Sequence, residues 1–88
     1  MINEDDGRYF RISSFYTAAF LFAKGIELVN IDNLQKGKSI FVFRDSPERE
    51  EYLRAFSFAK EDSPDSLIDA RKFVMAIKML KDKLYQNY

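Results

Sequence analysis

Apolar residues occur in short blocks along this chain, and their spacing alternates between the patterns typical of strands and of helices. Aromatic and β-branched residues dominate 8–12, which predicts a short strand. Two more strands are predicted over 26–31 and 39–44. Because the turn-forming residues 32–38 lie between them, we expect these two strands to form a β-hairpin with a long loop.

The first predicted helix covers 15–24 and contains the longest apolar run of the chain. Ser13 suits the N-cap position, and Gly25 suits the left-handed conformation that often ends a helix. On a helical wheel, only Thr17 and Lys24 form a polar edge. We therefore expect this helix to be buried on nearly every side.

A second helix is predicted to begin within 45–48, where Ser46 suits the N-cap and Pro47 the first helical position. Its apolar residues form a single stripe that consists of Tyr52, Leu53 and Phe56. The polar, proline-containing segment 59–66 that follows predicts a loop.

A third helix is predicted over 70–85, with Asp69 as its N-cap. Its apolar residues fall on one stripe at helical spacing, namely Phe73, Ala76, Ile77, Leu80 and Leu84. The elements follow the order β-α-β-β-α-α. The sequence therefore predicts an α+β fold, a small sheet built on the β-hairpin with helices packed on it. This single domain covers 8–88, after a flexible acidic tail over 1–7.

The last predicted strand is apolar on both faces, with Ile40 and Val42 on one and Phe41 and Phe43 on the other. A chain of 88 residues has few elements with which to cover both faces. We therefore expect a second subunit to supply part of the cover, which makes a homodimer the predicted assembly. The side chains expected to be most deeply buried are Phe20, Phe41, Phe73 and Leu80.

The charge balance and the absence of two residue types limit the classes of function that the chain can have. Basic and acidic residues each total 14, so the formal net charge is zero. Proteins that bind nucleic acid through its phosphates usually carry a basic excess, so this function is not favoured. The chain has no cysteine and no histidine. These residues supply thiolate nucleophiles, most transition-metal ligands and the commonest general base. We therefore expect that the chain is not an enzyme and that it binds no metal ion and no cofactor.

The N-terminal residues are acidic, unlike those of a secretory signal, and the run 18–23 is far too short to span a membrane. A short domain without cysteine is also not typical of secreted proteins. We therefore expect a cytoplasmic protein with no membrane partner.

Several segments together resemble a family of short bacterial and phage domains of unknown function. The matching segments are Ser13-Ser14-Phe15 through Ala18-Ala19 to Gly25, Phe41-Val42-Phe43 with Asp45-Ser46-Pro47-Glu48, and Asp69-Ala70-Arg71-Lys72-Phe73 with the lysine-rich end of the last helix. The chain departs from the family pattern at Ser14 and Ala70, where the family has Asp and Pro. The resemblance implies the same order of elements and a bacterium, phage or mobile element as the source, and it implies no activity.

The last helix carries the clearest functional signal. From 69 to 88 there are five basic and two acidic residues, which leaves a local charge of +3 (five minus two). Arg71, Lys78 and Lys81 fall within an arc of about 80° on a helical wheel. Such an arc is either a solvated helix face or a contact surface for an acidic partner or nucleic acid.

Met75 and Met79 lie four residues apart, outside the apolar stripe of the same helix. They form either a second core contact or an exposed interaction patch, and the sequence leaves both interpretations open. The predicted function is a non-catalytic protein-interaction module, and the alternative is a nucleic-acid-binding accessory domain that uses the last helix. The candidate partner-binding residues are Met75, Met79, Arg71, Lys78 and Lys81.

Overall fold

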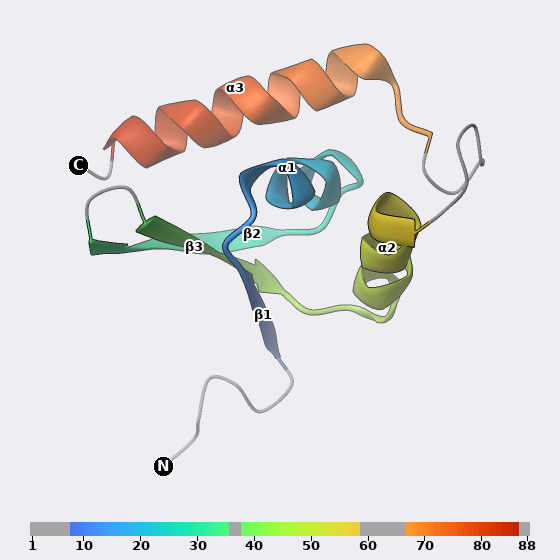
Figure 1. Ribbon diagram of the computed structural model, residues 1–88, viewed down its shortest axis with the longest axis horizontal. Coiled ribbons are helices and arrows are strands. Elements are labelled where there is room, and N and C mark those ends of the chain that lie inside the picture. The colour runs from blue at the N-terminus through green and yellow to red at the C-terminus, as the bar shows by residue number, and fades with distance from the viewer. Residues whose placement is uncertain (1–7, 36–37, 59–66, 87–88) are drawn as a thin grey trace.

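The computed structural model describes residues 8–35, 38–58 and 67–86 (Figure 1). The elements in chain order are β1 (Tyr9–Ile12), α1 (Phe15–Ala23), β2 (Leu28–Gln35), β3 (Lys38–Arg44), α2 (Pro47–Phe58) and α3 (Ala70–Gln86). This order confirms the predicted α+β fold. The acidic tail expected over 1–7 and the loop expected over 59–66 lie outside the described residues.

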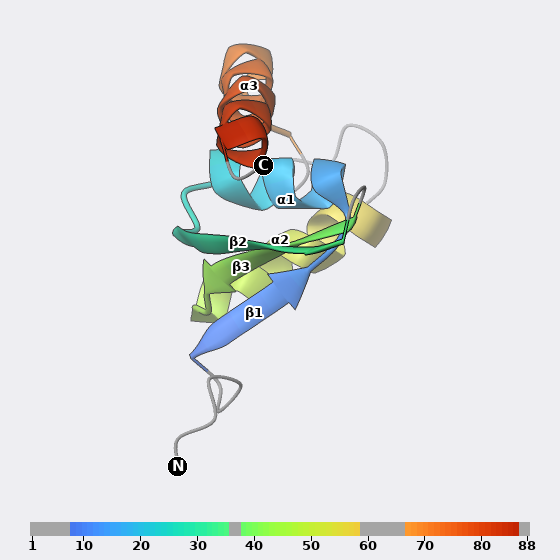
Figure 2. The same cartoon turned by 90° about the vertical axis from the view of Figure 1, so that its left-hand side faces the viewer.

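The three strands form an antiparallel sheet in the order β1-β3-β2, so β3 is central. Helix α1 lies between the sheet and α3 in both views (Figures 1 and 2). It contacts both α3 and α2. The fold is therefore layered in the order sheet, α1, α3, with α2 beside α1.

The hairpin strands are longer than predicted. Asp32 pairs with Ile40 and Asn33 pairs with Ser39, although 32–38 was expected to form the loop. The side chain of Ser39 donates a hydrogen bond of 2.6 Å to Asn33 across the two strands. Polar residues that favour turns are thus accommodated in the ladder, because their side chains bond to each other across it.

Helix α1 begins at Phe15, as predicted, but its N-cap lies one residue later than expected. Ser14, and not Ser13, is the N-cap, and its hydroxyl accepts a hydrogen bond from the backbone N–H of Thr17. The Ser14 hydroxyl also donates to the Thr17 hydroxyl at 2.9 Å. Thr17 was expected on a polar edge, but it is buried because this bond satisfies its hydroxyl. Tyr16 was expected to be covered, and it is 59% exposed.

Two predicted helix boundaries are confirmed. Gly25 follows α1 with a φ of 101°, a left-handed conformation that favours glycine. Asp69 caps α3, since its carboxylate accepts a hydrogen bond of 2.8 Å from the backbone N–H of Arg71.

The start of α2 is held differently from the prediction. The Ser46 hydroxyl is buried and has no hydrogen-bond partner among the described residues, so it is not the capping group. The Asp45 carboxylate instead accepts from the Ser46 backbone N–H at 2.9 Å and from two nitrogens of Arg49 at 2.9 and 3.1 Å. The Arg49 guanidinium lies 4.1 Å from the centroid of the Phe10 ring, which ties the first turn of α2 to β1.

The core forms where α1, the sheet and α3 meet. Phe20, Phe41 and Leu80 are at most 2% exposed, as predicted. Phe73 is only partly buried, contrary to the prediction, because it packs against the outside of the buried cluster. Leu80 of α3 lies in one buried cluster with residues of α1 and β3.

The chain itself covers most of both faces of β3, although Ile40 is only partly buried. Phe41 and Phe43 belong to the core cluster that includes α1 residues. Val42, on the opposite face, is only 5% exposed. It pairs with Arg11 of β1 and Asn30 of β2, whose side chains line the same face. Long polar side chains cover apolar surface with their stems. Val42 therefore needs no cover from a second subunit, and the homodimer itself stays a prediction.

Candidate protein-binding groove

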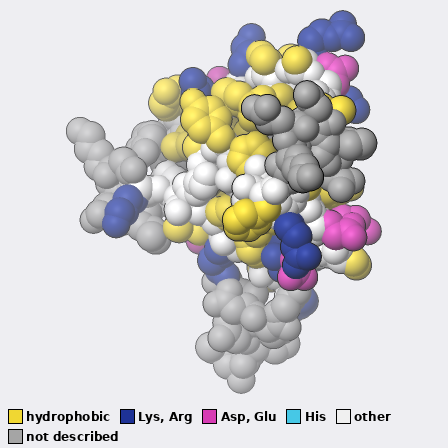
Figure 3. Space-filling model, turned by 45° about the vertical axis from the view of Figure 1, so that its right-hand side comes forward, with side chains coloured by type: hydrophobic (Ala, Val, Ile, Leu, Met, Phe, Trp, Pro, Cys, Tyr) yellow, Lys and Arg dark blue, Asp and Glu magenta, His cyan; other side chains and the backbone are white. Residues whose placement is uncertain are grey.

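A groove with a volume of about 880 Å³ runs along α3 beside the end of α1. Its largest apolar side chains are Phe22 from α1 and Val74, Met75 and Met79 from α3. Hydrophobic side chains gather in the part of the molecule where α1 and α3 lie, with Lys and Arg side chains at the upper edge (Figure 3). We call this surface the α3 groove.

The helical repeat explains why both methionines line the α3 groove. Ala76 and Leu80 turn into the core and are at most 3% exposed. Residues four apart lie one above the other on a helix, so Met75 and Met79 form a neighbouring stripe outside the core contact. Met75 is 57% exposed and Met79 is 44% exposed. The two methionines are therefore a surface patch and not a second core contact.

The rim of the α3 groove carries Asp69, Arg71, Lys72 and Lys78. The Asp69 carboxylate is engaged as the N-cap of α3, and it lies 3.8 Å from the Arg71 guanidinium. The Arg71 side chain is nevertheless 94% exposed. Within the described part of the chain, no acidic side chain pairs with Lys72 or Lys78. The rim is thus mainly cationic.

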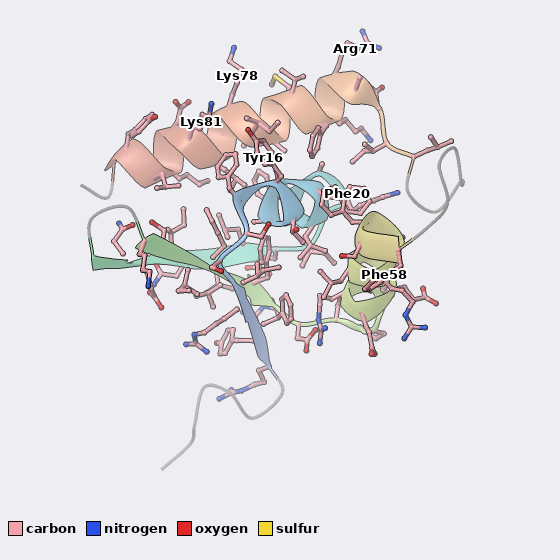
Figure 4. The ribbon with its side chains drawn as sticks, viewed as in Figure 1. Tyr16, Phe20, Phe58, Arg71, Lys78 and Lys81 are labelled. Atoms are coloured by element: carbon pink, nitrogen blue, oxygen red, sulfur yellow. The ribbon has the colours of Figure 1, made fainter. Side chains whose placement is uncertain are left out.

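The structure brings together four of the five residues predicted to bind a partner. Met75, Met79, Arg71 and Lys78 line the α3 groove, whereas Lys81 does not. Arg71, Lys78 and Lys81 all extend from α3 away from the body of the molecule (Figure 4). The basic arc expected from the sequence is therefore exposed, and only part of it borders apolar surface.

Sequence reasoning missed Phe22, Ala23, Lys72 and Val74 as lining residues. Val74 is 55% exposed and lies outside the core stripe of α3, so the helical wheel alone could have identified it. Phe22 offered no such signal, because nearly every position of α1 is apolar.

A second group of exposed apolar side chains surrounds the end of α2. Phe58, which is labelled in Figure 4, is 83% exposed. Leu67 is 55% exposed. Phe56 is 37% exposed and its ring centroid lies 4.8 Å from that of Phe20. These residues border 59–66, which are outside the described part of the chain, so we build no site on them.

Two pKa shifts occur at the start of α2, away from the α3 groove. The hydrogen bonds from Arg49 lower the pKa of the Asp45 carboxyl below its ordinary value. The same bonds raise the pKa of the Arg49 guanidinium. Each group thus stabilises the charge of the other, which is the behaviour of a structural ion pair.

The described residues form neither a metal site nor a membrane span. Over 8–35, 38–58 and 67–86, no three acidic side chains are placed together so that they could hold a metal ion. Within the same described ranges, no helix is long and apolar enough to cross a membrane.

Comparison with known proteins bears on the family alone. No curated protein and no solved structure matches the chain. The model of a family described as a domain of unknown function, DUF5659, matches residues 7–86, which include every described element. The resemblance to a family of small domains of unknown function is thereby confirmed. The chain belongs to the DUF5659 family.

Proposed function

We propose that this chain is a non-catalytic protein-interaction module that binds its partner through the α3 groove. The observation that carries the proposal is the exposure of Val74, Met75 and Met79 beside Phe22 in one groove. Water leaves such apolar surface when a partner covers it, which favours binding. Methionine side chains are flexible, so they adapt to the shape of the partner.

The layout of the α3 groove also suits a protein partner. An apolar centre surrounded by charged residues is the usual anatomy of a protein–protein interface. The 17 residues of α3 provide a surface about 25 Å long. Because α3 is a regular helix packed on the core, the backbone that carries these side chains is in place before the partner arrives.

The absence of catalysis is part of the proposal. All 88 residues include no histidine and no cysteine. The ion pair of Asp45 and Arg49 is committed to the fold. We also propose that the protein acts in the cytoplasm, since a domain of this size without cysteine needs no oxidising compartment.

Affinity capture from a lysate of the source organism tests the proposal. The bait is the parent chain, the double variant Met75→Glu with Met79→Glu, or the control variant Val29→Glu. Val29 is 42% exposed on β2 and does not line the α3 groove. We expect the parent and the control to recover the same partner. The double variant should recover at least about tenfold less of this partner. A partner that the folded double variant retains in full would contradict the proposal.

A nucleic-acid-binding domain is the second candidate, and the exposed arc of Arg71, Lys78 and Lys81 favours it. Three phosphate contacts would give a log–log salt slope of roughly −2 to −3, and each substitution by Ala would lower its size by about one. Fluorescence anisotropy with labelled duplex and single-stranded DNA measures this slope. We expect no tight binding, because the zero net charge gives no long-range attraction to a polyanion.

A further inference from the structure

Along most of its length, the α3 groove presents side chains and no free backbone. Residues 70–86 form one continuous helix, in which the backbone N–H groups from Phe73 onward donate to carbonyls four residues earlier. An extended strand docked here would find no main-chain partners, and its own backbone groups would be left unpaired where water is excluded. A helix does not incur this cost, because its backbone bonds are internal. The groove therefore favours a helical partner.

The spacing of the exposed residues supports the same class of partner. The exposed residues form pairs four apart, Val74 with Lys78 and Met75 with Met79, and Met75 and Lys78 lie three apart. Rows with this spacing form the ridges and grooves along which a second helix packs. A partner helix with apolar residues at the same intervals would bury its stripe on Met75, Met79 and Phe22.

The charge of the rim indicates what should flank that stripe. Three cations, Arg71, Lys72 and Lys78, border the α3 groove, against the single acidic residue Asp69. Over 69–88 the charge is +3 (five basic minus two acidic residues). Packing α3 of a second copy on this surface would bring two helices of equal positive charge together. Charge complementarity thus favours acidic residues on the partner and disfavours a second copy at this site.

We infer that the α3 groove binds an amphipathic helix of another protein whose apolar stripe is flanked by Asp and Glu. The inference rests on the proposed function and names the partner class. A homodimer of this chain would then use a different surface.

Synthetic peptides test the inference by fluorescence anisotropy. The probe is a labelled helical peptide of about 18 residues, the length of α3, with a Leu stripe at spacings of three and four and Glu on both flanks. One control peptide has Lys at every Glu position, and another has Gln at every Leu position. We expect the Leu/Glu peptide to bind about tenfold tighter than the Leu/Lys peptide, and the Gln peptide not to bind.

Variants of the protein locate the contact. Lys72→Glu and Lys78→Glu should each weaken the binding of the Leu/Glu peptide about three- to tenfold, and this effect should be smaller at high salt. Lys38→Glu is the matched control, since Lys38 is exposed at the start of β3 and does not line the groove. Met79→Glu should weaken both Leu peptides. Circular dichroism shows whether each variant keeps its fold.

The outcomes separate the inference from the proposed function. If the Leu/Glu and Leu/Lys peptides bind equally and both are lost with Met79→Glu, the groove binds helices and the acidic partner class is wrong. The inference is overturned if no peptide binds, or if the substitutions in the groove do not change the affinity. The capture experiment alone then decides the proposed function. Self-association lost with Met79→Glu would identify a second copy as the occupant and would also overturn it.

Discussion

Truncation of two adjacent residues of α3 should destabilise the protein to very different extents. Leu80 is completely buried among residues of α1 and the sheet, whereas Met79 is 44% exposed in the α3 groove. Leu80→Ala removes three buried carbons, worth about 2.4 kcal/mol of transfer free energy, and leaves a cavity, so about 3–4 kcal/mol of stability should be lost. Met79→Ala should cost less than about 1 kcal/mol, because water already covers much of its side chain and Ala favours helix.

Thermal unfolding followed by far-ultraviolet circular dichroism measures both effects. For a domain of this size, 1 kcal/mol shifts the melting temperature by about 4–8 °C. Leu80→Ala should therefore lower it by roughly 12–30 °C, and Met79→Ala by less than about 8 °C. Equal destabilisation by the two variants would show that the orientation of α3, and with it the exposure of the groove, is wrong.

Three further predictions concern the rest of the fold. Asp45→Asn should cost about 1 kcal/mol at neutral pH, because it weakens the hydrogen bonds to Arg49 and the Ser46 N–H. The lowered pKa of Asp45 sets the sign: its stabilisation is complete above the ordinary value of 3.8 and is lost as pH falls through the folded pKa. The parent and the variant should therefore converge in acid, and a constant gap in urea unfolding down to about pH 2 would contradict this assignment. Gly25→Ala should cost about 1–2 kcal/mol through its φ of 101° alone, since nothing lies within 4 Å of the added Cβ; an unchanged melting temperature would refute the left-handed turn. With no histidine, stability should be flat between about pH 6 and 8, and a transition there would reveal a strongly shifted group.

Local signals in the sequence predicted the helices better than the sheet. Gly25 and Asp69 mark helix boundaries through backbone conformation and capping, which depend on few neighbours. The strand order β1-β3-β2 depends on contacts between distant segments, and no local pattern encodes it. The predicted hairpin loop was too long, because the side chains of Asn33 and Ser39 form a hydrogen bond across the strands. Turn propensity does not reveal such a pairing.

The candidate site was predicted in part for a related reason. Met75 and Met79 were identified because they fall outside the apolar stripe of a strongly amphipathic helix. The sequence did not show whether the two methionines lie in the core or on the surface. That depends on how α1 packs against α3, which is a contact between distant segments of the chain. Phe22 was missed because α1 is apolar on nearly every side, so its wheel does not show which residue borders a groove.

The central claim, that partners bind through the α3 groove, can be observed directly at the two methionines. The chain has three methionines, Met1, Met75 and Met79. Methyl labelling with carbon-13 therefore gives a nuclear magnetic resonance spectrum in which two of the three methionine signals report on the groove. Titration with the partner recovered by affinity capture should shift the Met75 and Met79 signals to saturation. A partner that binds while both groove signals stay in place would contradict the account.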